Sequence, residues 1–250
     1  MMAIPYDCHT HTNMSDGRNS VEENVLMAEA TGLELVVISD HYWPHDDDLS
    51  ARVARIVAAD AASTIKVVAG MEVQIRDHLG TLALTESEAT LVQFVLADMG
   101  GTTKGIAMDP PAQIERYLDN VFRATLAAVQ NPLVDALAHP FNLGRFPAQV
   151  TPGQLPRTGL REVPAALYET DTAFEIMNQM PWWYPDVPVA QFTLEYADVL
   201  ALMAEKNVKF VLGSDAHSCG AVGNHGWCRR VMELAGIEKS QVVDLPRKFG

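Results

Sequence analysis

The first side chains able to do chemistry lie in residues 7–17, with the sequence D-C-H-T-H-T-N-M-S-D-G. If residues 4–11 form a strand, His9 and His11 point to one face, because side chains alternate with a period of two. Two imidazoles placed in this way can ligate one metal ion, and Asp16 follows in a polar loop that can fold back toward them. An isolated H-x-H on a surface strand is the simpler interpretation, so the rest of the chain has to decide.

More histidines and carboxylates follow short apolar runs that are typical of buried strands. Taken singly, each fits a hydrogen-bonded core residue or a surface charge. Together with the first stretch they make five histidines and three carboxylates, which are difficult to obtain at strand ends by chance. Mixed imidazole and carboxylate ligands suit Zn²⁺, Mn²⁺ or Fe²⁺. The additional residues are His41, Glu72, His139, Asp215 and His217.

The elements that must position these side chains alternate between buried strands and amphipathic helices. This alternation predicts parallel β/α units, and the polar residues stand at the carboxyl ends of strands, where a β/α barrel places its active site. An open doubly wound sheet is the competing topology, but it would struggle to gather five strand ends into one cluster. The predicted strands are 4–11, 35–39, 66–70, 80–84, 133–138, 173–177 and 208–213, and the predicted helices are 20–31, 49–62, 86–99, 111–129, 194–206 and 221–235.

Composition narrows the class of protein. The chain has 250 residues, of which 48% are hydrophobic, and a formal net charge of −14. This size fits one α/β barrel over residues 1–250, and the acidic balance disfavours binding to long nucleic acid. Three cysteines without framework spacing indicate a reducing compartment. We see no signal peptide and no apolar run of about 18 residues, so we expect a cytoplasmic protein without a membrane partner.

Five motifs now make the sequence recognisable. H-x-H-T-x-x-S-D-G, S-D-H, G-x-E, A-H-P and S-D-A-H occur in this order between residue 7 and about residue 223. This ordered set resembles the polymerase-and-histidinol-phosphatase (PHP) family. The resemblance implies an α/β fold of the distorted seven-stranded (β/α)7 TIM-like barrel type. It also implies two or three divalent metal ions, which would be Zn, Mn or Fe.

The resemblance assigns a metal ligand set residue by residue. It implies that Glu72 bridges two ions and that Glu72, Asp215 and His217 are catalytic. The second ion of the family usually takes another histidine between the bridging glutamate and A-H-P. Only His78 lies in that interval, and its spacing does not cleanly match. The implied sets are His9, His11, Glu72 and Asp215 for the first ion, Glu72 and His139, with His78 as a candidate, for the second, and Asp16, His41 and His217 for the third.

The ligand types alone indicate metal-assisted hydrolysis, and the resemblance adds phosphoester hydrolysis. A hydroxide between two metals about 3.5–4 Å apart is a nucleophile at neutral pH. We therefore expect a histidinol-phosphatase-like phosphoesterase that acts on a small phosphomonoester. Phosphate recognition usually needs a cation, and Arg145 is the best candidate, followed by Arg161 and then Lys104. The aromatic run 182–184 fits a substrate wall or a structural corner.

Three other classes of function remain open. A phosphodiesterase or nuclease would use the same metals on short or cyclic nucleotides. An amidohydrolase-type enzyme also opens with H-x-H, but it commonly uses a strand-end lysine as the metal bridge, and no lysine sits suitably here. A non-catalytic, metal-stabilised binding module is the third class. His45, in the loop after His41, either faces the substrate or is a solvated loop residue.

Overall fold

The computed structural model describes residues 4–43 and 48–250, so the predicted position of His45 lies outside the described residues. Its strands form one sheet in which every neighbouring pair is parallel. The order in the sheet is β1-β2-β4-β5-β6-β7-β8, and β3 also pairs with β4. The strands are β1 (Tyr6–Asp7), β2 (Leu35–Ile38), β3 (His41–Tyr42), β4 (Lys66–Gln74), β5 (Phe94–Asp98), β6 (Ala136–Leu137), β7 (Ala173–Met177) and β8 (Phe210–Gly213).

Strands β2 and β3 are two parts of one interrupted strand. Leu35 lies opposite Lys66 and His41 lies opposite Glu72, so the same register continues across the break. The sheet therefore follows seven strand paths, and its two edges approach each other through backbone hydrogen bonds. The Cys8 N–H donates to the Leu212 carbonyl at 3.1 Å, and the next such bond joins the segments after β1 and β8. The result is the predicted distorted barrel of seven parallel strands.

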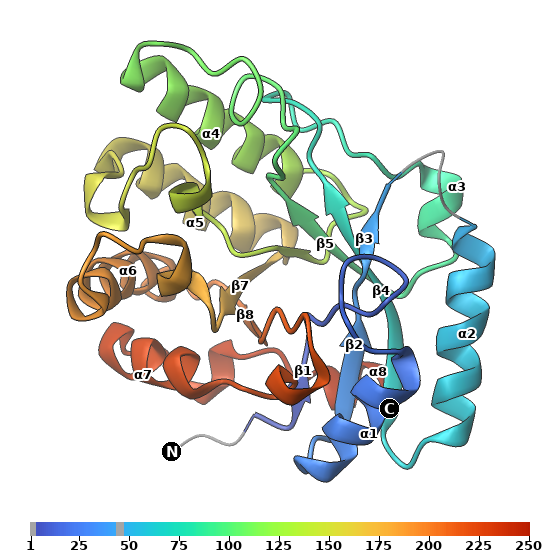
Figure 1. Cartoon of the computed structure of the whole chain (residues 1–250). Helices are drawn as coiled ribbons and strands as arrows, with labels where there is room; N and C mark the ends of the chain where they lie inside the picture. Colours follow the sequence, from blue (N-terminus) through green and yellow to red (C-terminus); the bar gives the residue numbers. More distant parts are fainter. Residues whose placement is uncertain (1–3, 44–47) are drawn as a thin grey trace.

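Helices surround the strands on the outside of the barrel (Figure 1). The first one begins where a capping box predicts it, because the Ser20 hydroxyl accepts the Glu23 N–H and the Glu23 carboxylate accepts the Ser20 N–H. Among the described residues, no helix is long and apolar enough to cross a membrane. The helices are α1 (Val21–Ala30), α2 (Leu49–Ala62), α3 (Glu86–Ala89), α4 (Ile114–Val129), α5 (Arg157–Thr170), α6 (Val189–Ala204), α7 (Gly226–Ala235) and α8 (Leu245–Phe249).

Two predicted elements are wrong. The expected helix over 86–99 is only the four residues of α3, and the following run Phe94–Asp98 is β5, at the middle of the sheet. Strand pairing on both sides and complete burial override the helical preference of its leucine and alanine. The expected strand over 80–84 contributes only a bridge between Ile75 and Leu82. Helix α5 was not predicted, and it carries Pro164 in its interior.

Candidate metal centre

The carboxyl ends of the strands bring the five predicted histidines and three predicted carboxylates into one cluster. Each potential ligand atom lies within 4.8 Å of the others in its group. Two histidines belong to two groups each, so the three groups are contiguous. The groups are His9, His11 and Asp215; His9, Glu72 and His139; and His11, Asp16, His41 and His217.

Imidazole nitrogens and carboxylate oxygens converge at the centre of the cluster. The Nε2 atoms of His9 and His11 lie 3.0 Å apart, and the His11 Nε2 lies 3.1 Å from Asp215 Oδ1. Glu72 Oε2 lies 3.4 Å from the His9 Nε2, and Glu72 is only 2% exposed. Burial alone would raise the pKa of Glu72, but the charges of His41 and His9 outweigh it and hold that pKa well below its usual range.

The side of the cluster around His139 is completed by a carboxylate that the sequence analysis missed. The His139 Nε2 lies 3.0 Å from Glu72 Oε1, while its Nδ1 lies 3.5 Å from Asp98 Oδ1. Asp98 ends β5 and is ion-paired with Arg145, whose guanidinium also donates to the Met99 carbonyl at 2.8 Å. The pattern F-V-L-A-D matches the other strand ends, but the sequence analysis places it in a helix over 86–99 instead of a strand.

A second missed carboxylate, Glu175, fixes two histidines from inside the barrel. Its Oε1 lies 2.8 Å from the His9 Nδ1, and its Oε2 accepts the His139 N–H at 2.6 Å. Glu175 stands in the middle of β7 and is fully buried. Gly213 on the neighbouring strand leaves room for this pair, because a Cβ there would collide with the glutamate. A charged residue inside the predicted strand 173–177 was the available signal.

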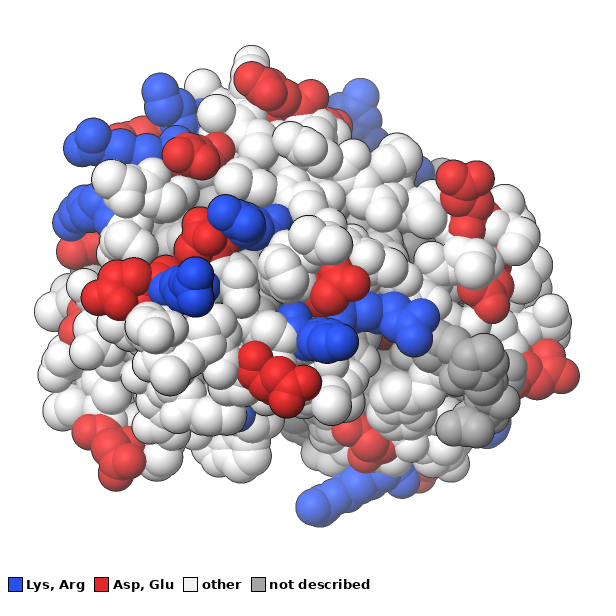
Figure 2. All heavy atoms as spheres, turned by 90° about the horizontal axis from the view of Figure 1, so that it is seen from above, with Lys and Arg blue, Asp and Glu red and all other residues white. Residues whose placement is uncertain are grey.

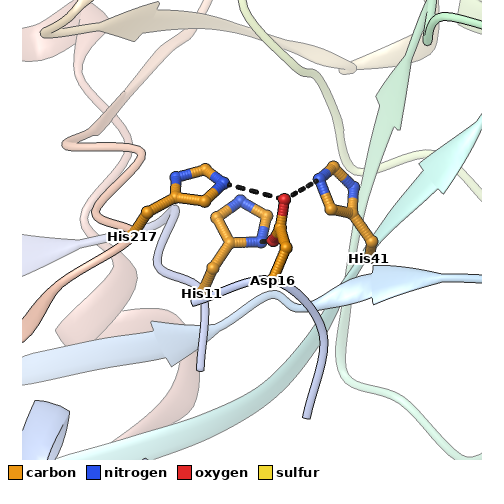
Figure 3. A group of neighbouring side chains, drawn as sticks. All are labelled: His11, Asp16, His41 and His217. Carbon is orange, nitrogen blue, oxygen red and sulfur yellow. Dashed lines mark ion pairs between the residues drawn. The ribbon is translucent and has the colours of Figure 1, made fainter. Parts of the chain in front are cut away.

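The third group is more open than the other two. Asp16 Oδ2 lies 3.3 Å from the His217 Nε2 and 3.6 Å from the His41 Nε2, and it stands between the two rings (Figure 3). The Nδ1 of His11 points to the same carboxylate at 3.7 Å. Burial would raise the pKa of Asp16, but hydrogen bonds from His217 and His41 lower it strongly. The side chains of Asp16 and His217 are 45% and 43% exposed, so a ligand can reach this group from solvent.

The loop that carries Asp16 is held by the S-D-H motif. Asp40 accepts the Thr12 N–H at 2.7 Å and the Ser15 hydroxyl at 2.5 Å. Gly17 closes the loop, and a Cβ at this position would lie 2.5 Å from the His11 carbonyl oxygen. Through these contacts the aspartate of the S-D-H motif holds the loop that contains the S-D-G motif.

The remaining predicted residues lie in different surroundings. His78 is in none of the three groups; its Nδ1 lies beside Gly105 and is buried with no hydrogen-bond partner in the described part of the chain. Arg161 is exposed on α5, and its role in substrate binding stays a prediction. In the aromatic run, Tyr184 is buried and accepts the Leu143 N–H at 2.9 Å, as a structural corner would.

A cavity of about 270 Å³, here called the inner cavity, opens beside the cluster. Its wall includes His41 and Glu72 from the cluster and the pair Asp98 and Arg145. The Nε of Arg145 is buried and has no acceptor among residues 4–43 and 48–250. The printed contacts of this guanidinium, to Asp98 and to the Met99 carbonyl, both come from Nη2, so the group keeps donors beyond that pair.

The donor set fits divalent cations. The imidazole nitrogens and buried carboxylate oxygens direct their lone pairs toward shared points. Burying so many acceptors side by side is costly unless they bind a cation. Mixed nitrogen and oxygen donors are what Zn²⁺, Mn²⁺ and Fe²⁺ prefer.

The chain is similar to known proteins over most of its length. The family model for the PHP domain matches residues 7–214. A protein of Thermoanaerobacter sp. named "Probable phosphatase" is 28% identical over 97% of this chain and 91% of that relative. An Acetivibrio thermocellus protein with the same name is 26% identical over 93% of this chain and 87% of the relative.

The similarity extends to a solved structure. Histidinol phosphate phosphatase from Lactococcus lactis, solved with zinc, L-histidinol and phosphate, aligns with a TM-score of 0.72. The alignment covers 94% of both chains at 21% identity. At this identity the likeness establishes the barrel fold alone.

Proposed function

This chain belongs to the PHP domain family, and from that premise we propose that it is a metal-dependent phosphoesterase that hydrolyses a small phosphomonoester. The observation that carries the proposal is the set of three contiguous imidazole–carboxylate groups at the carboxyl ends of the strands. Relatives that span nearly the whole chain bear the name of phosphatases, and the Lactococcus lactis structure holds zinc, an alcohol and phosphate. These names motivate the substrate class.

We propose the following ligand assignment for two or three divalent ions. His9, His11, Glu72 and Asp215 would hold the first ion, and Glu72 and His139 the second. Asp16, His41 and His217 would hold the third. Ions bound there would supply an activated water and neutralise phosphoryl oxygens.

The residues of the chain perform the positioning. Glu175 and Asp98 hold the far nitrogens of His9 and His139, which fixes how the two rings face the centre. Arg145 stays paired with Asp98, so it stands at a constant place on the wall of the inner cavity. The guanidinium side chain is 16% exposed and would donate to a phosphoryl oxygen with an N–H that Asp98 and Met99 do not use, because the planar group carries five N–H donors.

A small ester fits the surface better than a long polynucleotide. The chain carries a formal charge of −14, and Figure 2 shows basic and acidic side chains interspersed on the face it presents. A polyanion needs a continuous basic track, which such mixing does not provide. The phosphodiesterase or nuclease reading is an outcome of the test below.

The test is phosphate release by protein that has been stripped of metal and restored with Mn²⁺, Zn²⁺ or Fe²⁺. The panel contains histidinol phosphate, aryl phosphomonoesters, an aryl phosphodiester and short nucleotides. We expect metal-dependent release from monoesters and much slower cleavage of the diester. Faster cleavage of the diester would replace the proposal with a phosphodiesterase. No release from any ester, with metals bound, would overturn it in favour of amide or lactone hydrolysis or a binding role.

A further inference from the structure

A second cavity shares part of its wall with the inner cavity. It has a volume of about 700 Å³ and is here called the outer cavity. Gln74 and Thr102 line both cavities, and the amide of Gln74 is hydrogen-bonded to the hydroxyl of Thr102. The two cavities therefore share a polar stretch of wall.

One segment of the chain runs through both cavities. Glu72 lines the inner cavity, Gln74 lines both, and Arg76 lines the outer one. The segment stays extended after β4, since Ile75 is bridged to Leu82 and the Arg76 N–H donates to a carbonyl across the turn at 2.7 Å. Residues two apart on extended chain share a face, and four residues span about 13 Å. Arg76 in the outer cavity and Glu72 in the metal centre are thus the two ends of one extended segment.

Two cations without an ion pair stand together in the outer cavity. The Lys104 N–H donates to the Arg76 carbonyl at 2.8 Å, so the two residues are backbone neighbours. Both side chains are exposed, and neither forms an ion pair with the described residues. The same wall contains two acids. Asp77 accepts the backbone N–H groups of its own turn, at 2.9 Å for the first, which leaves Asp109 as the acid facing the cavity with no such bond.

We infer that the outer cavity is the subsite for the leaving group of the substrate, in which Arg76 and Lys104 bind a second anionic group, a carboxylate or a phosphate. This inference rests on the proposed function. The substrate is then elongated, with a scissile phosphate at the metal centre and a second anion on the order of 10 Å away, which corresponds to the length of the extended segment from Glu72 to Arg76. Asp109 opposes this anion, which limits how strongly a substrate with several charges is held.

The experiment compares three esters on the metal-loaded protein. Phenyl phosphate has no second anion, and two linked aryl phosphates carry a terminal carboxylate or a terminal phosphonate, a stand-in for phosphate that is not hydrolysed, at the end of a flexible chain of about 10 Å. We expect the wild type to show a lower KM for the linked esters, and the better of the two identifies the anion. The variants R76Q and K104Q should each raise that KM roughly 10-fold, as the loss of a charge-assisted contact would.

Matched variants separate this effect from general damage. K104R should restore the low KM, while D109N should lower it further, because the opposing charge is gone. R230Q replaces an exposed arginine on α7, paired with Glu233 at 3.5 Å, and should leave all KM values unchanged. In R76Q and K104Q, KM should rise more for the linked esters than for phenyl phosphate, which has no second anion. The KM advantage of the linked esters should shrink as salt rises, since exposed charges are screened.

The outcomes are distinguishable. Equal KM values for phenyl phosphate and the linked esters in the wild type would overturn the subsite and leave the proposed function intact. The same holds if R76Q and K104Q slow all three esters alike. No release from any ester would overturn both.

Discussion

The two sides of the metal centre are built differently. On the side of His139, the side chains of Asp98 and His139 are 6% and 3% exposed, and each is fixed by contacts inside the barrel. On the side of Asp16, the side chains of Asp16 and His217 are 45% and 43% exposed and stand on loops. Contacts within the protein fix the side chains of the buried side, whereas the arrangement of the side chains on the open side depends more on a bound ligand.

This difference follows from the origin of the residues. Asp98 ends a central strand, where it is paired with Gln74 of β4, and Glu175 lies within β7, where it is paired with Val211 of β8. Asp16 and His217 follow the ends of β1 and β8, where backbone contacts such as the bond of the Arg18 N–H to the His217 carbonyl, 3.0 Å long, replace the ladder. Substitutions on the buried side should therefore disturb geometry, and those on the open side should mainly change occupancy.

The largest effect is expected where both sides meet. His9 belongs to two of the three groups and contacts Glu72, Asp215 and Glu175. The variant His9→Ala should lose more activity than the 10–100-fold typical of a residue that only supports a ligand. Bound metal, measured by inductively coupled plasma mass spectrometry, should fall with it. His78→Ala, whose site lies outside the groups, should keep its metal; wild-type metal content in His9→Ala would contradict the assignment.

The next effect tests the buried side. Asp98→Asn removes the charge beside the His139 Nδ1 and leaves Arg145 without its ionic partner. We expect a 10–100-fold lower metal affinity, the range known for carboxylates that orient a metal-bound histidine. Calorimetric titration of the metal-free protein with metal measures this affinity. An unchanged titration curve would reduce Asp98 to a structural role.

A smaller effect is expected on the open side. Asp16→Asn weakens the group formed with His41 and His217 but leaves the contacts of Glu72 with His9 and His139 in place. The variant should bind fewer ions and lose about 10-fold in activity. Metal content and kcat on an aryl phosphate provide the readout. A total loss of metal would show that the two sides are one cooperative site.

The sequence predicts the directly converging residues far better than their supports. Histidines and carboxylates at the ends of apolar runs stand out because such runs must be buried strands, and the predicted barrel places their ends together. Asp98 was missed because F-V-L-A-D follows a real helix start at Glu86, and local preference could not reveal the strand pairing that ends the helix. Glu175 was missed although its strand was predicted with the correct bounds, since nothing local shows which side chains it meets.

Some features of the structure depend on contacts between distant residues, which local sequence patterns do not reveal. The fold class and the capped start of α1 depend on periodicity and capping, which are local signals. The helix at 157–170, which was not predicted, contains a proline in its interior, a residue that disfavours helix. Arg145 was chosen as a phosphate cation from its position after A-H-P, and its pairing with Asp98 depends on a residue 47 positions away.

The smallest predicted effect is the pH dependence of stability without metal. Burial lowers the pKa of His41, but the charge of Glu72 and a hydrogen bond to Asp16 outweigh it and raise that pKa to about 11. The pKa values of His9, His139 and His217 are also raised. A raised histidine pKa contributes stability that is full below the unfolded value of about 6.5 and declines as pH rises toward the folded value.

The carboxylates and one histidine act in the opposite direction. Lowered pKa values of Glu72, Asp16 and Asp215 give stability that is present above about pH 4.5 and lost in acid. Burial lowers the pKa of His11, so charging this residue also costs stability below about pH 6.5. The chelated protein should therefore be most stable near pH 5–6.5 and should melt at least about 4 °C lower at pH 9.

Thermal melts in chelator across this range measure the effect, and metal should reverse it. Ligation requires deprotonated imidazoles, so the gain in melting temperature from added metal should grow with pH. Glu72→Gln should flatten the slope of the chelated protein more than Asp16→Asn, because the Nδ1 of His41 lies 2.9 Å from the buried Glu72 and its Nε2 lies 3.6 Å from the half-exposed Asp16. Equal flattening by the two variants would remove the distinction between the buried and the open side.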